Sequence, residues 1–482
     1  MEYIGWLFCG LIAGVLGCYF GMKFWNENRS KQTGGRVPIS ELVKNHFQPL
    51  PTDDISISER QFPFRVRADL QRTIDKLFGS ETKVLHFCGV RNEYSHGTVT
   101  LSDCIVESQH NPAVSIPPEY EELDIGEELP IRVLKNGLWL LEKTEVRFAV
   151  LLAPTGRYGE MTGMQFQVGT PNSHAGTAIT QEFFRHLEAS ILRADSYRGK
   201  ILSLEQPEHG YSGKSTGISV HKLRTVERDE VILPQSTLTL LERNVIEFVK
   251  HRDKLTKFKQ ATKKGILFYG PPGTGKTHTI HFLAGALHGH TTLLISAEQV
   301  GLLSEYMTLA RLLQPSIVVM EDVDLIARDR KDMNSPCEEV LLNKLLNEMD
   351  GLKENADILF ILTTNRPETL EAALASRPGR IDQAIEFPLP DDAGREKLVQ
   401  LYAPDSGLSD ENVTEIVRRT EGVSAAFIKE LMRRTIQFYI ESGSSGDITH
   451  ANIDDALNEM LHKGGPLNLK LLGATQHGTT VN

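Results

Sequence analysis

The sequence has few cysteines and no excess of basic residues. Five of its 482 residues are cysteine, and none of them stands in a Cys-x-x-Cys pair. Neither a disulfide framework nor a zinc site is therefore indicated, and a reducing compartment is the simpler interpretation for most of the chain. Lysine and arginine together number 52, against 63 for aspartate and glutamate, which gives a net charge of −11. We expect no nucleic-acid partner, because no basic surplus is available to neutralise phosphates.

The first residues of the sequence lack charge. No charged side chain occurs in Tyr3–Met22, a stretch long enough for one helix to cross a bilayer. A cleaved signal peptide is the alternative, but it normally begins with positive charge, and the only early charge here is Glu2. Basic residues follow the apolar stretch, as is usual on the cytoplasmic side or in an equivalent inner compartment. We therefore predict a single-pass membrane protein whose remaining chain lies in the cytoplasm. The basic residues are Lys23, Arg29, Lys31 and Arg36.

The chain is long enough for two or three domains, and its composition is that of a globular protein. From about residue 225, strand and helix patterns alternate, which predicts an α/β domain with a parallel sheet. After residue 390 the strand patterns end, and four helical segments opened by Ser, Thr or Asp predict a helical subdomain. The segments are 391–402, 409–419, 424–441 and 449–462. The expected parts are a membrane anchor (1–25), a linker (26–39), a mixed α+β domain (40–220), the α/β domain (225–390), the helical subdomain (391–463) and a flexible tail (464–482).

The α+β domain at residues 40–220 carries no motif that points to a chemistry. The amphipathic run Arg65–Leu77 predicts a helix. The apolar runs Ile131–Leu134 and Leu138–Leu141 flank Asn136 and Gly137, which predicts a β-hairpin with its turn at these two residues. We expect the acidic residues and histidines of this domain to be structural or solvated, and its role is unknown.

Residues 270–277, with the sequence GPPGTGKT, fit the pattern of a phosphate-binding loop. They lie between an apolar strand pattern (265–269) and a helical pattern (278–287), which is the context that this loop requires. Its glycines let successive backbone N–H groups converge on an anion, and the helix adds the positive end of its dipole. Lys276 can reach the terminal phosphates, and the Thr277 hydroxyl can ligate Mg²⁺. We predict that nucleoside triphosphate contacts Gly270, Pro271, Pro272, Gly273, Thr274, Gly275, Lys276, Thr277 and His278.

Polar residues follow two further apolar strand patterns. Glu321 and Asp322 come after the run 317–320, and Asn365 closes the run that begins at residue 358. Open α/β sheets bind ligands where parallel strands end, so these residues are candidates for the metal site and for orienting water. Phosphoryl transfer also needs positive charge on the γ-phosphate, and Arg377 and Arg380 stand three apart on a predicted turn.

Together these motifs make residues 229–462 resemble an AAA-family ATPase. The resemblance also covers Met349–Leu352, the run ALASRPGRID at 373–382, and 422–428, which is similar to the lid motif of the family. It implies ATP hydrolysis with Mg²⁺ at the subunit interfaces of a homo-oligomeric ring, usually of six subunits. By position, it implies that Asn365 senses the γ-phosphate and that Asp350 signals between subunits. It also implies that Arg377 and Arg380 are fingers that act on the neighbouring subunit.

Two features depart from the usual family pattern. Family members normally carry Asp-Glu at the second acidic motif, whereas this chain has Glu321 followed by Asp322. That order resembles the subgroup of the mitochondrial chaperone that translocates the folded Rieske protein. Position then assigns the metal, with Thr277, to Glu321 and the water to Asp322, whose shorter side chain is consistent with slow turnover. In addition, the segment 297–313 is short and has no aromatic residue before Gly301, so threading of an unfolded chain is not favoured.

The sequence therefore predicts a membrane-anchored ATPase that remodels or chaperones proteins at the cytoplasmic face. A nucleotide-dependent assembly scaffold with little hydrolysis and an ATPase partner of a separate peptidase are the alternatives. A zinc protease within the chain is not expected, because none of the sixteen histidines stands in a His-Glu-x-x-His motif.

Overall fold

The computed structural model describes residues 38–80, 82–92, 98–106, 112–157, 160–205, 217–326, 337–368, 379–404, 407–443 and 446–463. These residues form two compact units, of which the first contains most of the chain up to residue 191 and the second most of the rest. The predicted membrane anchor at Tyr3–Met22 and the predicted tail at 464–482 lie outside the described residues. Within the described ranges, no helix has the length and apolar character needed to span a membrane.

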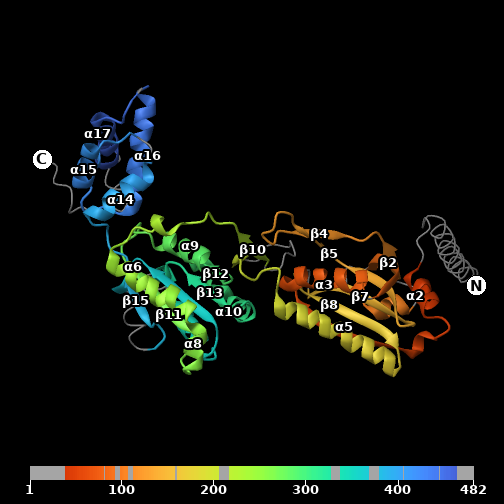
Figure 1. Ribbon diagram of the computed structural model, residues 1–482. Coiled ribbons are helices and arrows are strands. Elements are labelled where there is room, and N and C mark those ends of the chain that lie inside the picture. Colours follow the sequence, from red (N-terminus) through yellow and green to blue (C-terminus); the bar gives the residue numbers. More distant parts are fainter. Residues whose placement is uncertain are drawn as a thin grey trace, which may run out of the picture. The chain divides into compact units, whose positions relative to one another are not determined.

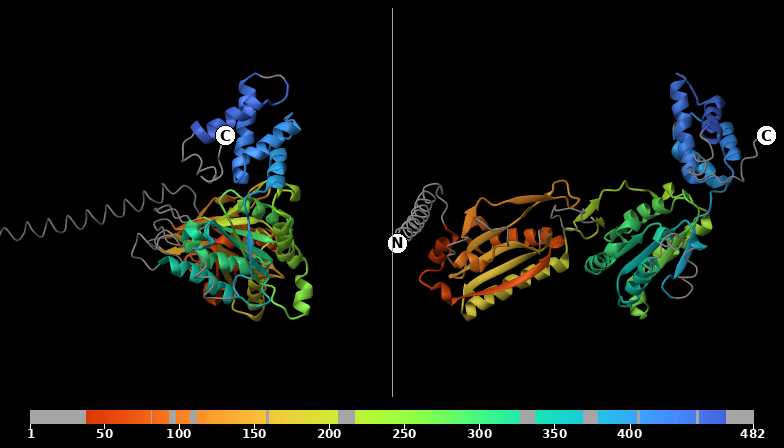
Figure 2. Two further views of the ribbon diagram at one scale, coloured as in Figure 1. Left: turned by 90° about the vertical axis from the view of Figure 1, so that its left-hand side faces the viewer. Right: turned by 180° about the vertical axis from the view of Figure 1, so that it is seen from behind.

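The first unit is built on an antiparallel sheet of six strands in the order β1-β8-β7-β6-β2-β3 (Figures 1 and 2). Its strands are β1 (Ile55–Pro63), β2 (Lys83–Asn92), β3 (Ala113–Ile116), β6 (Gly137–Lys143), β7 (Val146–Arg157) and β8 (Glu160–Pro171). Its α-helices are α2 (Ile39–Phe47), α3 (Arg67–Ser80), α4 (Leu101–Ile105) and α5 (His174–Arg193). Two short strands, β4 (Tyr120–Leu123) and β5 (Ile131–Leu134), form a separate antiparallel pair. This arrangement confirms a mixed α+β domain, with α3 close to the predicted helix Arg65–Leu77.

Helices cover both faces of this sheet because its central strands are apolar at nearly every position. On β6, Trp139 and Leu141 belong to a core that includes α3 and α5. Leu138 and Leu140 belong to a second core with α2 and α4. Successive side chains of a strand point to opposite faces, so a run without polar alternation requires a layer of helices on each side.

The predicted hairpin around Asn136 and Gly137 is wrong. β5 pairs with β4, and β6 pairs with β7 from Lys143 and Val146 onward, so the tight turn is formed by Thr144 and Glu145. Both of these residues have positive φ, at 51° and 64°, which is the backbone that a two-residue hairpin turn requires. The Asn136 side chain instead accepts a hydrogen bond from the backbone N–H of Val90, at 3.0 Å.

The second unit contains a sheet of seven strands in the order β10-β9-β12-β13-β14-β11-β15. Every neighbouring pair is parallel except β10 with β9, which confirms the predicted α/β architecture. The strands are β9 (Ile201–Leu204), β10 (Ile218–His221), β11 (Lys264–Tyr269), β12 (Thr291–Ile295), β13 (Ser316–Met320), β14 (Ile358–Thr364) and β15 (Gln383–Glu386). The helices before the lid are α6 (Gln235–Leu241), a π-helical turn (Glu242–Ile246), α7 (Glu247–Lys250), α8 (Arg252–Lys257), α9 (Lys276–Ala286), α10 (Leu303–Leu312), α11 (Val323–Ile326) and α12 (Cys337–Asp350).

The boundary between the units lies earlier than the sequence patterns placed it. β9 pairs in parallel with β12, so residues 201–204 extend the sheet of the second unit. Tyr306 of α10 fixes this extra strand: its hydroxyl accepts a hydrogen bond from the N–H of Leu204, at 2.7 Å, and donates one to Gln299, at 2.9 Å. The Gln299 amide in turn donates to the carbonyl of Leu204, at 2.8 Å. The Tyr306 side chain is fully buried, and it therefore belongs to the core.

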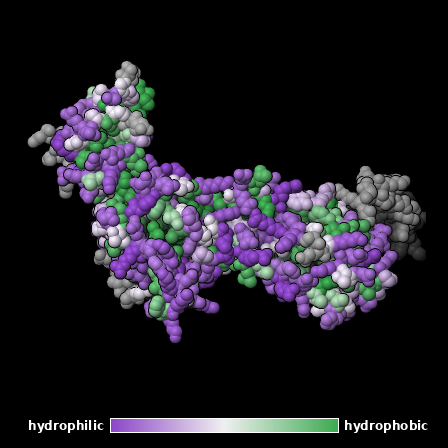
Figure 3. Space-filling view, in the orientation of Figure 1, coloured by the Kyte–Doolittle hydropathy of each residue, from purple (hydrophilic) through white to green (hydrophobic). Residues whose placement is uncertain are grey.

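Residues 391–463, which we call the lid, form four helices close to the predicted positions. They are α14 (Asp392–Tyr402), α15 (Asp410–Arg419), α16 (Ala425–Glu441) and α17 (His450–Asn458), followed by a π-helical turn (Glu459–Lys463). Asp391, Ser409 and Ser424 cap the first three helices by accepting hydrogen bonds from backbone N–H groups. Hydrophilic side chains cover most of the visible face of both units, with apolar patches among them (Figure 3).

Candidate nucleotide-binding site

The phosphate loop at residues 270–277 connects β11 to α9, as its sequence context predicted. Three of its glycines have positive φ: 148° at Gly270, 76° at Gly273 and 98° at Gly275. At Gly270 a side chain is also excluded by space, because a Cβ would lie 2.2 Å from the carbonyl oxygen of Phe387. These conformations bend the loop around the N-terminus of α9, where backbone N–H groups can donate hydrogen bonds to phosphate oxygens.

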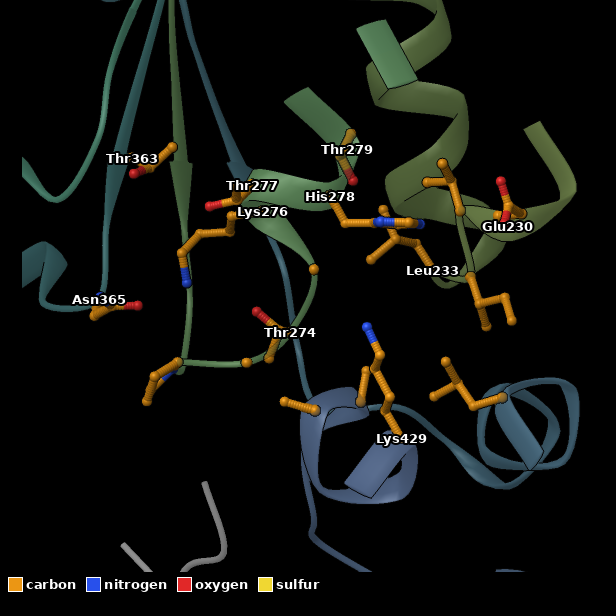
Figure 4. A pocket seen from close by; sticks show the side chains of 18 of the residues that line it. Glu230, Leu233, Thr274, Lys276, Thr277, His278, Thr279, Thr363, Asn365 and Lys429 are labelled. Atoms are coloured by element: carbon orange, nitrogen blue, oxygen red, sulfur yellow. The ribbon is translucent and has the colours of Figure 1, made fainter. Parts of the chain in front are cut away.

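Lys276 lies under this loop and is only 6% exposed. Its ammonium donates hydrogen bonds to the carbonyl oxygens of Gly270, at 2.8 Å, and Pro271, at 2.9 Å. Burial lowers the pKa of Lys276 to about 8, and this effect is opposed by the nearby carboxylates of Asp322 and Asp324. The lysine is therefore mainly protonated at neutral pH, and its side chain projects into the pocket beside Thr277 (Figure 4).

Thr277 and Glu321, the two predicted metal ligands, lie side by side. The Thr277 hydroxyl donates a hydrogen bond to Oε1 of Glu321, at 2.6 Å. Thr277 is the second residue of α9, and Glu321 follows β13 directly, so the sheet places both at the edge where its parallel strands end. A hydroxyl and a carboxylate are the hard oxygen donors that Mg²⁺ prefers, and this donor set fits the predicted cation.

Asp322 and Asn365 form the second predicted pair. Nδ2 of Asn365 donates a hydrogen bond to Oδ1 of Asp322, at 2.9 Å, and both residues line the pocket. Asp322 has a positive φ of 49°, and its N–H donates to the hydroxyl of Thr363, at 3.0 Å. Burial raises the pKa of the Asp322 carboxyl, and the negative charges of Asp324 and Glu321 raise it further. A more basic carboxylate is better suited to accept a proton from water.

Asp324 is a part of the site that the sequence patterns did not identify. It is 3% exposed, and its Oδ1 accepts hydrogen bonds from the Thr364 hydroxyl, at 2.9 Å, and from the N–H of Asn365, at 3.1 Å. It thereby fixes the end of β14 and the backbone that carries the Asn365 amide. The available signal was a third carboxylate two residues after Asp322, close to a strand end.

The pocket has a volume of about 370 Å³ and extends from the phosphate loop to the lid. Its far end is lined by residues that the sequence analysis missed: Glu230, Val231, Ile232, Leu233, Leu398, Tyr402, Ala425, Ala426 and Lys429. Figure 4 shows Glu230 and Leu233 on one side of it and Lys429 reaching in from the lid. Most of these side chains are apolar and come from separate segments, and only Ala425 and Ala426 lie in a run, 422–428, that the sequence patterns had singled out.

Of the two predicted arginine fingers, the structure describes Arg380 alone, and Arg380 does not line this pocket. Arg377 lies outside the described residues. Arg380 forms an ion pair with Asp350, and its Nε donates to Oδ1 of Asp350 at 3.0 Å. Neither Arg380 nor Asp350 is among the residues that surround the cavity, so Arg380 does not serve the nucleotide site of its own subunit. Its action on a neighbouring subunit stays a prediction.

Comparison with known proteins identifies the domain. Residues 266–389 match the family described as "ATPase family associated with various cellular activities (AAA)". The chain is 32% identical to ATP-dependent zinc metalloprotease FtsH 2 of Symbiobacterium thermophilum, over 46% of this chain and 40% of that protein. It is 35% identical to the proteasome-activating nucleotidase of Methanocaldococcus jannaschii, over 39% of this chain and 47% of that protein.

The chain thus spans less than half the length of these curated relatives, and the similarity is centred on the nucleotide-binding region. That region contains the phosphate loop, the pair of Thr277 and Glu321, and the pair of Asp322 and Asn365. Proteins of this family are ATP hydrolases that use ATP with Mg²⁺. Residues 266–389 of this chain thus form a domain that matches the AAA family of ATPases.

Proposed function

We propose that this protein is a membrane-anchored AAA ATPase that hydrolyses ATP in a homo-oligomeric ring, of about six subunits. It would use the cycle to remodel or chaperone protein substrates at the cytoplasmic face of its membrane. The observation that carries the proposal is the convergence of Lys276, Thr277, Asp322 and Asn365 on one pocket, with Glu321 bonded to Thr277. The uncharged stretch Tyr3–Met22 and the basic residues after it support the anchor and its orientation.

The residues of the pocket have different roles in hydrolysis. Backbone N–H groups of the phosphate loop and the Lys276 ammonium would hold the phosphates of ATP, while Thr277 and Glu321 would hold Mg²⁺. The cation would supply positive charge to the phosphates. Asp322 orients the attacking water and accepts its proton as the oxygen attacks the γ-phosphate and ADP leaves. Asn365 keeps the Asp322 carboxylate in place through their hydrogen bond, and is well placed to contact the γ-phosphate.

A neighbouring subunit would supply the arginine that completes the site. No described arginine lines the pocket, so a guanidinium that contacts the transferred phosphate has to come from elsewhere. Arg377 and Arg380 stand in the run that resembles the fingers of the family. Arg380 is held by Asp350 within its own subunit, so formation of the ring has to redirect this guanidinium if it is to act as a finger.

The substrate is proposed to be a protein that is not threaded through an aromatic loop. The segment after β12 forms a 3₁₀-helix (Ala297–Leu302) and then α10, and its tyrosine, Tyr306, is buried. An exposed aromatic side chain that could grip an extended chain is therefore not supplied by Tyr306. The name of the proteasome-activating nucleotidase favours one alternative, an ATPase partner of a separate peptidase.

Measuring ATP turnover by the full chain tests the proposal. The wild-type protein is expected to hydrolyse ATP, and Asp322→Asn is expected to bind ATP but lose about 100-fold or more of the rate, because the proton acceptor is removed. Normal turnover by Asp322→Asn would assign the proton to another group. Nucleotide binding with no turnover in the wild-type ring would instead support an assembly scaffold.

Mixing two inactive variants tests whether the site is shared. Arg377→Ala and Arg380→Ala are each expected to cost on the order of 10³-fold in rate if they act as fingers. Mixed with Lys276→Ala, which keeps both arginines but lacks the phosphate-binding lysine, either variant should regain part of the activity. Mixed rings without any recovered activity would contradict catalysis across a subunit interface.

A further inference from the structure

Two apolar side chains of the second unit project into solvent. Leu129 is 78% exposed and Phe258 is 77% exposed, the two highest values among the large hydrophobic residues that the structure describes. Both belong to the second unit, and both lie outside residues 266–389, which match the AAA family. One exposed apolar residue is ordinary on a protein surface. These two differ from that case because each is accompanied by charge of one sign, and the two signs are opposite.

The segment around Phe258 is basic. From residue 250 to residue 264 the chain has seven basic residues and one acidic residue. Lys254, Lys257 and Lys259 are exposed, and none of their ammonium groups has a hydrogen bond or an ion pair with another described residue. Phe258 is therefore an apolar group among positive charges that are available to a partner. We call Phe258 and these three lysines the basic surface.

The backbone holds Phe258 in its exposed position. Phe258 caps the end of α8, and Lys259 after it has a positive φ of 57°. The N–H of Gln260 then donates a hydrogen bond to the carbonyl of Leu255, at 3.0 Å. The N–H of Lys259 donates to the carbonyl of Thr256, also at 3.0 Å. These are the two hydrogen bonds of a Schellman motif, which fixes the chain where a helix ends and so fixes the direction in which Phe258 projects.

The segment before Leu129 is acidic. From residue 119 to residue 128 the chain has six acidic residues and no basic residue. Glu128 is exposed and has no ion pair with another described residue. The segment is fixed to the second unit by Ile125, which is fully buried and whose carbonyl accepts a hydrogen bond from the Lys200 ammonium. We call Leu129 and the acidic residues 124, 127 and 128 the acidic surface.

The two surfaces belong to opposite ends of one sheet. The acidic surface lies beside β10, because a Cβ on Gly126 would lie 2.5 Å from the Val220 side chain. Phe258 stands six residues before β11, which is five positions from β10 in the sheet, or about 24 Å at the usual strand spacing (Figure 1). Complementary surfaces at different places on one subunit make a head-to-tail contact between copies, and such contacts form a ring where the rotation closes.

We propose that the basic surface docks on the acidic surface of a second copy of this chain, with Phe258 packed beside Leu129 inside a border of opposite charges. This inference rests on the proposed ring and names a contact within it. Opposite charge at the rim selects this partner surface and its orientation, while the two apolar side chains leave water at the centre. Neither surface lines the nucleotide pocket, so the contact contributes to assembly and takes no direct part in hydrolysis.

Disulfide cross-linking tests the contact directly. A full chain that carries both Leu129→Cys and Phe258→Cys is kept in detergent with ATP and Mg²⁺ and is oxidised with copper phenanthroline and oxygen. It is expected to give a ladder of covalent oligomers, because each subunit then pairs with the next one on both sides. The two single variants and the wild type, treated in the same way, are controls for the native cysteines. Rings that form without giving this ladder would overturn the inference.

Charge reversal tests whether these particular charges meet. Glu128→Lys and Lys257→Glu are each expected to raise the concentration of half-assembly about fivefold, since like charges then face each other at an exposed rim. A chain that carries both substitutions should assemble like the wild type, because the pair is restored with its signs exchanged. Lys397→Glu, at an exposed lysine of the lid, is the matched control and should change nothing. Sedimentation velocity on the full chain measures all four variants.

The outcomes separate this inference from the proposed function. If the wild type assembles and neither charge reversal weakens assembly, the inference fails and the proposed ring stands. If both reversals weaken assembly but the combined variant is weaker still, the two charges face different partners and the inference also fails. If the wild type stays monomeric with ATP and Mg²⁺, the proposed ring itself fails.

Discussion

The two units contain sheets of similar size, but the two sheets differ in strand direction and in whether polar residues gather at the strand ends. The antiparallel sheet of the first unit buries apolar side chains on both faces and gathers no polar cluster that suggests a reaction among its described residues. The mainly parallel sheet of the second unit is just as apolar inside, yet Glu321, Asp322 and Asn365 meet at one edge. In a parallel sheet all strands end at the same edge, whereas antiparallel neighbours end at opposite edges. Strand direction therefore decides whether polar strand ends can form a site.

The largest expected effect is on ATP binding, and it tests whether that binding is confined to the unit with the parallel sheet. Lys276→Ala removes the ammonium from the phosphate loop and is expected to weaken ATP binding on the order of 100-fold or more, because charge-assisted hydrogen bonds to phosphate are lost. Lys143→Ala removes a lysine of the first unit that pairs with Glu182, at 2.9 Å, and should leave ATP affinity unchanged. Calorimetry on both variants measures the contrast. Comparable losses in the two would mean that the first unit also takes part in binding.

An intermediate effect concerns the boundary between the units. Tyr306→Phe leaves the buried N–H of Leu204 without its acceptor and is expected to destabilise β9 by about 1–3 kcal/mol. Amide hydrogen exchange across residues 201–204 should become faster, while ATP affinity is retained. Thr308→Ala on the same helix removes only an exposed hydroxyl bond to Ser304 and serves as the control. Unchanged exchange in Tyr306→Phe would show that β9 is held by backbone pairing alone.

The smallest expected effect is on folding stability, and it is tested at one carboxylate from each unit. Hydrogen bonds from Arg433, and from Arg434 beside it, lower the pKa of Glu430 in the lid to about 2. This pKa lies below the ordinary value of 4.5. The contribution of the ionised Glu430 to folding stability is therefore complete above about pH 4.5 and is lost as the pH falls toward 2. Glu430→Gln should thus lower the free energy of unfolding by about 0.5–1 kcal/mol at pH 7, and by less at pH 3. The effect is small because the ion pairs of Glu430 with the two arginines are largely exposed.

Glu182 of the first unit is the comparison for that experiment. Its pKa is also lowered, chiefly by a hydrogen bond from the single lysine Lys143, so Glu182→Gln should have the smaller effect. Thermal unfolding of both variants between pH 7 and pH 3 measures the two differences. A loss of stability in Glu430→Gln that grows as the pH falls would contradict the assigned sign.

The sequence was sufficient where local chemistry decides the structure. The phosphate loop needs glycines with positive φ before a lysine, and the lid helices begin at side chains that can cap them, so both were predictable from short segments. The α/β alternation likewise predicted the parallel sheet. These features depend on neighbours within a few residues of one another.

The sequence was insufficient where distant segments choose their partners. Asn136 and Gly137 could form a hairpin turn, but pairing of β5 with β4 left that turn unused. β9 pairs with β12 and is bonded to Tyr306, both about a hundred residues further along the chain. The far wall of the pocket and the buried Asp324 were also missed, because their roles arise only when β13, β14 and the lid come together.

Three consecutive residues at the far wall of the pocket belong to two different cores. Val231 and Leu233 pack into the core of the parallel sheet, whereas Ile232, between them, packs against the core of the lid. Any tilt of one core relative to the other must therefore turn the peptide bonds around Ile232. The same residues line the cavity, so a molecule bound there contacts the segment that joins the two cores.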